Sequence, residues 1–184
     1  KQCDDSKFQL AAHCNPQGRV TSLLYVIKHP LGFYLLTHTD MVQSAFDALN
    51  KYAVFSKVTL SIKDCFLVGC INDQPNDDKA ICQGSFYPSR QLAIFEKPPE
   101  LSTNIDALWH YHDIASGLPR LYPNTVDKFV APRLNLEYLN AISYKKGCYI
   151  GQEIIARLYF KGKLKHHMYL GKSTDTIPLQ AEDT

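Results

Sequence analysis

The segment "GRVTSLLYVIKHPLGFYLLT" (residues 18–37) decides the fold class of the chain. Its first half, residues 20–28, is rich in β-branched and aromatic residues, which favour strands. Residues 29–32 (HPLG) carry the proline and glycine typical of a turn, and residues 33–37 return to strand composition. Two strands joined by so short a turn are antiparallel neighbours, so the sequence predicts a β-hairpin here.

The residues after this hairpin change from strand to helical periodicity. The apolar positions that share one helical face are Met41, Val42, Ala45, Phe46 and Leu49. We therefore expect a helix over residues 39–52, with its cap at position 39 or 40.

The rest of the chain alternates between the two patterns. Strand composition marks residues 55–70, 81–86, 91–96 and 159–172, helical spacing marks 105–116 and 149–158, and residues 117–147 are irregular. Consecutive strands interrupted by single helices predict an α+β fold of antiparallel sheets with packed helices. The proline-containing joint at residues 96–100 (EKPPE) divides the chain into subdomains 1–97 and 98–184, which we expect to interlock.

Composition excludes several classes of protein. The 184 residues are 45% hydrophobic and 21% charged, with a formal net charge of +2, as in ordinary globular domains. No apolar run approaches the ~20 residues that a membrane helix needs, so no membrane partner is expected. The six cysteines form no CxxC pair, which argues against a structural zinc site. We expect reduced thiols and a cytoplasmic protein.

The stretch "SYKKGCYIGQE" (residues 143–153) carries one cysteine, Cys148, between two glycines. If a helix begins at or just after Cys148, its dipole and the nearby Lys145 and Lys146 would lower the pKa of the thiol. A buried cysteine in a glycine-rich turn is an equally good interpretation. No cysteine–histidine partnership is visible, which disfavours a protease-like nucleophile.

The other polar clusters point to no tightly bound metal. His166 and His167 are adjacent, and neighbours on a strand face opposite sides, so a shared metal is not predicted. The basic residues between Arg157 and His167 could contact nucleic acid, but a solvated edge is the favoured interpretation.

At this point a family resemblance becomes visible. The stretches "KKGCYIGQE" and "IIARLYFKGKLKH" resemble the signature of the YgfZ family, the folate-binding relatives of the glycine-cleavage aminomethyltransferase (T-protein). The blocks "LAAHCNPQGRV", "LNKYAVFSKVTL" and "DIASGLPRL" are similar to further family blocks in the same order. The resemblance implies a T-protein-like folate-binding fold of interlocked subdomains, here expected to lack the family's C-terminal β-barrel.

The resemblance also implies a function and a set of site residues. It implies a tetrahydrofolate-binding accessory protein for the assembly or repair of iron–sulfur client enzymes, including enzymes that modify tRNA. Cys148 would be the functional thiol, and Asp113 and Tyr149 would lie at the folate site, although Ala115 stands where the family often has a carboxylate. The signature loop would comprise Lys146, Gly147, Tyr149, Gly151, Gln152, Glu153 and Arg157.

Two alternatives stay open beside this one. The first is a folate-dependent aminomethyltransferase, but Ser22 falls where those enzymes carry an aspartate, and a hydroxyl cannot accept a proton as a carboxylate does. We therefore predict an accessory protein without conventional turnover. The second alternative is a basic RNA- or protein-binding module.

Overall fold

In the computed structural model, residues 6–72, 79–100, 105–162 and 164–175 are described. The first sheet contains β1 (Gln9–Cys14), β2 (Val20–His29) and β3 (Gly32–Leu36), antiparallel and in the order β1-β2-β3. His29 pairs with Gly32, which leaves a two-residue turn between β2 and β3. The predicted hairpin is confirmed.

The second sheet contains β4 (Phe66–Ile71), β5 (Cys82–Phe86) and β6 (Arg90–Phe95), antiparallel and in the order β4-β6-β5. The strand expected over residues 55–70 is confirmed only from Phe66 onward. Residues 57–65 lie outside both sheets, and strand propensity without a neighbour to pair with does not make a strand.

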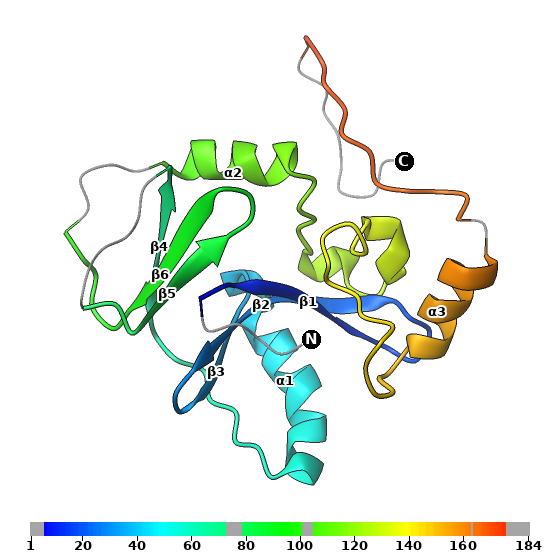
Figure 1. The fold of residues 1–184 in the computed structure, drawn as a ribbon, viewed down its shortest axis with the longest axis horizontal. Coiled ribbons are helices and arrows are strands. Elements are labelled where there is room, and N and C mark those ends of the chain that lie inside the picture. Colours follow the sequence, from blue (N-terminus) through cyan, green and yellow to red (C-terminus); the bar gives the residue numbers. More distant parts are fainter. Residues whose placement is uncertain (1–5, 73–78, 101–104, 163, 176–184) are drawn as a thin grey trace.

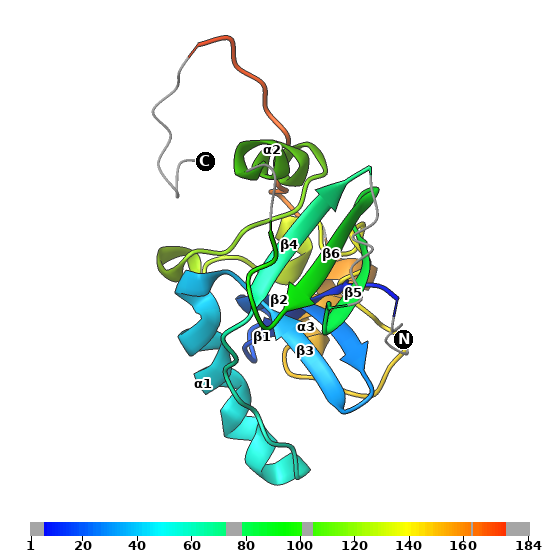
Figure 2. The same ribbon diagram turned by 90° about the vertical axis from the view of Figure 1, so that its left-hand side faces the viewer.

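The two sheets meet beside the start of β1, as Figures 1 and 2 show. The N–H of Phe8 donates to the Ser85 carbonyl at 3.0 Å, and the N–H of Ser85 donates to the Ser6 carbonyl at 2.8 Å. These two bonds join the first sheet to β5. The predicted α+β class with antiparallel sheets is confirmed.

The described residues form three α-helices beside the sheets. They are α1 (Val42–Ala53), α2 (Asp106–Ala115) and α3 (Gln152–Lys161), and short 3-10 helices span Thr39–Met41, Val54–Ser56, Pro123–Thr125 and Ala131–Leu134. The expected cap at position 39 or 40 is wrong, because α1 is capped by Met41 and a 3-10 turn occupies those positions. The irregular segment 117–147 with short helical turns is confirmed.

The C-terminal part of the chain differs from the prediction in the bounds of its helix and in the absence of a strand among its described residues. The helix predicted over residues 149–158 begins at Gln152 and continues to Lys161, so Tyr159, Phe160 and Lys161 are helical rather than extended. Residues 164–172 form no strand. The helix extends because its aromatic residues pack against the loop before it rather than across a sheet: the Tyr144 and Tyr159 rings stack 4.4 Å apart.

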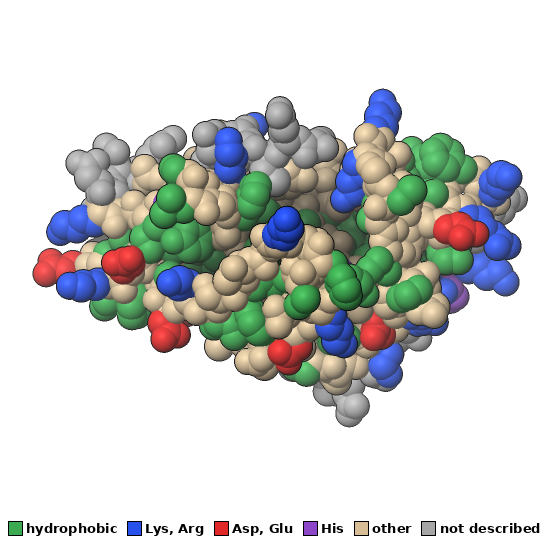
Figure 3. Space-filling model, turned by 90° about the horizontal axis from the view of Figure 1, so that it is seen from below, with side chains coloured by type: hydrophobic (Ala, Val, Ile, Leu, Met, Phe, Trp, Pro, Cys, Tyr) green, Lys and Arg blue, Asp and Glu red, His purple; other side chains and the backbone are tan. Residues whose placement is uncertain are grey.

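Large apolar side chains also reach the surface. Figure 3 shows hydrophobic side chains between charged ones on the face seen from below. Leu31 and Phe55 are among the most exposed, at 93% and 86%. No helix of the described residues is long and apolar enough to cross a membrane.

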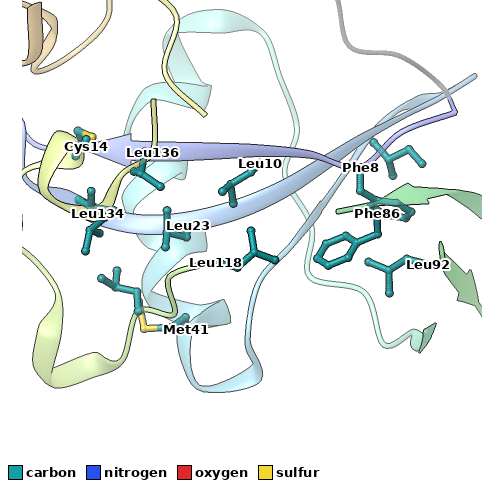
Figure 4. Packing of buried hydrophobic residues seen from close by; sticks show 14 of the residues in the cluster. Phe8, Leu10, Cys14, Leu23, Met41, Phe86, Leu92, Leu118, Leu134 and Leu136 are labelled. Atoms are coloured by element: carbon teal, nitrogen blue, oxygen red, sulfur yellow. The ribbon is translucent and has the colours of Figure 1, made fainter. Parts of the chain in front are cut away.

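One hydrophobic cluster runs through both halves of the sequence. Figure 4 shows its labelled members Phe8, Leu10, Cys14, Leu23, Met41, Phe86, Leu92, Leu118, Leu134 and Leu136. Ile155 of α3 belongs to the same cluster and is 1% exposed. The core therefore ties α3, and the stretch just before it, to the first sheet. The division into subdomains 1–97 and 98–184 stays a prediction.

Candidate functional site

The signature stretch forms a loop that enters α3. Gly151 caps the helix with a positive φ of 80°, and Gln152 is the first helical residue. Cys148 is exposed and lies three residues before the cap. The helix therefore begins four residues after Cys148, so the condition of a helix start at or just after the thiol is not met. The first N–H group of the helix, that of Gln152, donates to the Tyr149 carbonyl at 3.1 Å and is therefore not available to the Cys148 thiol.

Gln152 fixes the loop around Tyr149. Its side-chain Oε1 accepts a hydrogen bond from the Tyr149 N–H at 3.1 Å, reciprocating the backbone bond between the same residues. The Lys146 Nζ lies 4.6 Å from the centroid of the Tyr149 ring, within range of a cation–π interaction. Two signature residues, Gln152 and Lys146, thus contact Tyr149, the first at its backbone and the second at its ring, which gives both a role in positioning it.

The loop rests on the turn between β1 and β2. Gly151 lies so close to this turn that an added Cβ would stand 2.6 Å from the Asn15 carbonyl oxygen and 2.9 Å from the Gly18 Cα. The turn itself is ordered by Asn15, whose Oδ1 accepts the N–H groups of Gln17 and Arg19, both at 3.0 Å. Backbone therefore packs on backbone between segments that are more than 130 residues apart in sequence.

A pocket of about 370 Å³ opens beside this contact. Its walls come from β1, the C-terminal part of α1 and residues 141–150, with Ala12, Leu49 and Ile142 among the apolar contributors. Tyr149 and Lys146 contribute polar groups, and the buried Tyr149 hydroxyl has no hydrogen-bond partner among the described residues. Pockets of this size, largely apolar with a few polar groups, are typical of small-molecule sites.

Cys14 and His13 also line this pocket, and sequence reasoning did not select either. Burial raises the pKa of the Cys14 thiol to about 11, although the charge of Lys146 opposes the change. Burial lowers the pKa of His13. Near neutral pH both groups are thus uncharged. The only sequence signal was their place in the block "LAAHCNPQGRV", because nothing in the spacing links that block to Cys148.

The Cys14 thiol should make the protein less stable in alkali. Since its pKa rises from 9.0 to about 11 on folding, the unfolded state loses the thiol proton first, and stability is lost between these two values as pH rises. The loss from this group amounts to about 3 kcal/mol. Urea unfolding at pH 8 to 11 should give a shallower decline for Cys14→Ala than for the parent chain. Parallel pH curves for the two proteins would contradict this prediction.

Asp113 does not line the pocket that contains Tyr149. Its Oδ1 is 2.8 Å from Nη1 of the buried Arg90. It lines a second, smaller pocket of about 110 Å³, together with Tyr25, Trp109 and Arg120. The two residues expected at one folate site, Asp113 and Tyr149, therefore line two different pockets.

The remaining signature residues are on the surface. Gly147, Glu153 and Arg157 are exposed, and none of them lines either pocket. Cys148 itself is not a lining residue, although Lys146 and Tyr149, which flank it in the loop, both are. Within the described part of the chain, no three His, Cys, Asp or Glu side chains are grouped so that they could hold a metal ion.

Comparison with known proteins gives a consistent set of relatives. No family model matches the chain. An uncharacterized protein of Haemophilus influenzae is 38% identical over 174 residues, covering 89% of this chain and 59% of its own length. The tRNA-modifying protein YgfZ of Aliivibrio fischeri is 32% identical over 187 residues, with the same coverages of 89% and 59%. The protein of that name from Colwellia psychrerythraea is 29% identical over 209 residues, covering 97% and 64%. The chain thus spans about three fifths of the length of these curated relatives.

Proposed function

The chain belongs to the YgfZ family, and from this premise we propose that it is a tetrahydrofolate-binding accessory protein with a reactive thiol. It would serve iron–sulfur enzymes, including enzymes that modify tRNA, in the cytoplasm. The name of the relatives supports the link to tRNA modification. The T-protein-like folate-binding arrangement of interlocked subdomains is part of the same proposal.

The observation that carries the folate proposal is the buried Tyr149 hydroxyl in the wall of the larger pocket, which has no hydrogen-bond partner within the part of the chain that the structure describes. A buried polar group normally has a partner, so this one is suited to a ligand that offers a hydrogen bond. A pterin ring is flat and carries both acceptors and donors at its edge. The residues present fit such a ring: Tyr149 would bind its edge, and apolar side chains such as Leu49 and Ile142 would contact its faces.

Cys148 supplies the second part of the proposal. Its side chain is exposed on the loop that borders this pocket, and Lys146 and Tyr149 on either side line the pocket. No base is hydrogen-bonded to the thiol among the described residues, and a hydrolytic nucleophile needs one. An exposed thiol without a base suits exchange or transient contact with a client protein. Tetrahydrofolate, when bound, carries one-carbon groups.

The environment of Ser22 supports an accessory protein over an aminomethyltransferase. Ser22 is fully buried on β2, and its hydroxyl has no partner among the described residues. A neutral hydroxyl in an apolar setting cannot hold a positive charge or act as a base near neutral pH. The site that would carry aminomethyl transfer is therefore without its carboxylate.

Titration calorimetry with tetrahydrofolate tests the proposal with three matched variants. Tyr149→Phe removes the hydroxyl in the larger pocket, Tyr25→Phe removes one that lines the smaller pocket, and Tyr138→Phe removes one on the surface. We expect the parent chain to bind and Tyr149→Phe to bind about 2- to 10-fold more weakly, as for the loss of one hydrogen bond. The other two variants should bind as the parent does.

Two outcomes would overturn this assignment. If only Tyr25→Phe weakens binding, the ligand occupies the smaller pocket beside Asp113. If the chain gives no heat with tetrahydrofolate, the folate part of the proposal is wrong for this chain. The thiol part is separate, because iodoacetamide should label Cys148 faster than the buried Cys14 in either case.

A further inference from the structure

The loop before α3 and the end of α3 form a cluster of three aromatic rings. Tyr144 and Tyr159 stack with their ring centroids 4.4 Å apart and their planes inclined by 20°. Phe160 meets Tyr159 edge-on, with centroids 4.8 Å apart and an angle of 83°. Tyr159 is 52% exposed and Phe160 is 67% exposed. The cluster is thus ordered by its own contacts and still presents rings to solvent.

Tyr144 holds this cluster in place. Its hydroxyl donates a hydrogen bond to the Glu137 carboxylate at 2.5 Å. Burial, followed by this hydrogen bond, raises the pKa of Tyr144, so the phenol stays protonated and keeps donating. A platform fixed in this way loses little further side-chain freedom when a ligand lies on it.

The sequence around the rings is rich in basic residues, although the Glu137 carboxylate accepts the hydrogen bond from Tyr144. The sequence from residue 144 to 167 contains the basic residues Lys145, Lys146, Arg157, Lys161, Lys163 and Lys165 and a single acidic one, Glu153. Arg157 and Lys161 are exposed neighbours at i and i+4 on α3, a spacing at which like charges repel. Neither forms an ion pair within the described residues. Figure 3 shows Lys and Arg side chains gathered at the right-hand end, where α3 lies in Figure 1. An anionic partner would relieve this repulsion.

The basic surface continues beyond the helix. The segment after α3 is held to the 3-10 helix Ala131–Leu134 and its cap, because the Met168 N–H donates to the Arg133 carbonyl at 2.9 Å and Asn135 Nδ2 donates to the Met168 carbonyl at 2.7 Å. Lys165 and His166 are exposed on this anchored segment. The basic residues therefore extend from α3 onto the segment that follows it.

We propose that the aromatic–basic surface, defined as Tyr144, Lys145, Arg157, Tyr159, Phe160 and Lys161, binds single-stranded nucleic acid. Unstacked bases would lie on the open rings of Tyr159 and Phe160, and phosphates would contact Arg157 and Lys161. Exposed rings on the same helix as cations that form no ion pair within the described ranges fit this ligand better than a duplex, whose base faces are already stacked. The inference does not depend on the folate pocket, since none of these six residues lines it.

Fluorescence anisotropy with a labelled oligouridylate tests this inference. Phe160→Ala should weaken binding about 5- to 100-fold, as expected when one base can no longer stack on a ring. The combined Arg157→Gln and Lys161→Gln variant should weaken binding and reduce the slope of log K against log salt by about 0.7 for each phosphate that is no longer neutralised. Both changes affect exposed side chains, so the fold should be retained.

The matched control is Phe55→Ala, which removes an 86% exposed phenylalanine from a different surface. It should leave oligouridylate binding unchanged. Equal effects of Phe160→Ala and Phe55→Ala on oligouridylate binding would overturn base stacking in favour of charge alone. The same conclusion would follow if the parent chain and Phe160→Ala both bound heparin, which has no bases, as tightly as they bind oligouridylate. Absence of oligonucleotide binding at low salt would overturn the inference altogether.

Discussion

Replacing Arg90 with methionine should lower the free energy of unfolding by about 3 to 5 kcal/mol, the loss typical when one partner of a buried ion pair is removed. Arg90 is 1% exposed, and its Nη1 lies 2.8 Å from the Asp113 carboxylate. Its Nε and Nη2 both donate to the Tyr87 carbonyl, at 3.0 and 2.6 Å. The substitution would leave the carboxylate without its cation and this carbonyl without its donors.

The guanidinium also organises the aromatic side chains around it. Its central carbon lies 4.9 Å from the Phe86 ring centroid and 4.3 Å from that of Trp109. These two rings are stacked 5.4 Å apart and join the second sheet to α2. Methionine can fill the same space, so most of the expected loss comes from the unpaired charge and the missing hydrogen bonds rather than from a cavity.

Urea unfolding of three variants separates these contributions. Arg90→Lys keeps the charge but loses the planar fork, so it should fall between Arg90→Met and the parent. The double variant Arg90→Met, Asp113→Leu removes both charges and should recover part of the loss. A loss of less than about 1 kcal/mol for Arg90→Met would mean that water already reaches the pair and screens it.

Local sequence patterns were sufficient for the elements that are stabilised by their neighbours along the chain. The β-branched and aromatic composition and the HPLG turn predicted the β2–β3 hairpin, and the two-residue turn between His29 and Gly32 then fixes its register. The helical face predicted α1, but not its cap, because the preceding turn tightened into a 3-10 helix. The prediction of a strand over residues 57–65 was wrong because these residues, despite their strand propensity, have no neighbouring strand to pair with in either sheet.

The candidate site depends on contacts that no local pattern reveals. The resemblance selected Gln152 and Tyr149 together, but not the pocket, because His13 and Cys14 come from the opposite end of the chain. Arg90 follows a YPS sequence typical of an exposed turn, but its guanidinium packs against the rings of Phe86 and of Trp109 from α2. Composition also could not show that Asp113, expected near Tyr149, would be paired with this arginine.

Gly151, where the signature loop contacts the β1–β2 turn, should be the other position at which a substitution strongly lowers stability. Gly151→Ala should lower the free energy of unfolding by about 2 to 4 kcal/mol, combining the cost of a left-handed backbone for alanine with overpacking. The left-handed φ of 80° supplies the first cost. The Asn15 carbonyl oxygen, 2.6 Å from the new Cβ, supplies the second, and as a backbone atom it cannot turn aside.

Gly147→Ala is the matched control, because this glycine is in the same loop, has no positive φ, and has no atom within 4 Å of an added Cβ. It should change stability by less than about 0.5 kcal/mol. Hydrogen exchange then shows where the loss occurs: in Gly151→Ala the Tyr149 amide, which is bonded to Gln152, should exchange faster, while amides of the β4-β6-β5 sheet keep their protection. Similar exchange in both alanine variants would mean that the loop does not need its contact with the turn. The turn would then not be what holds Tyr149 at the pocket.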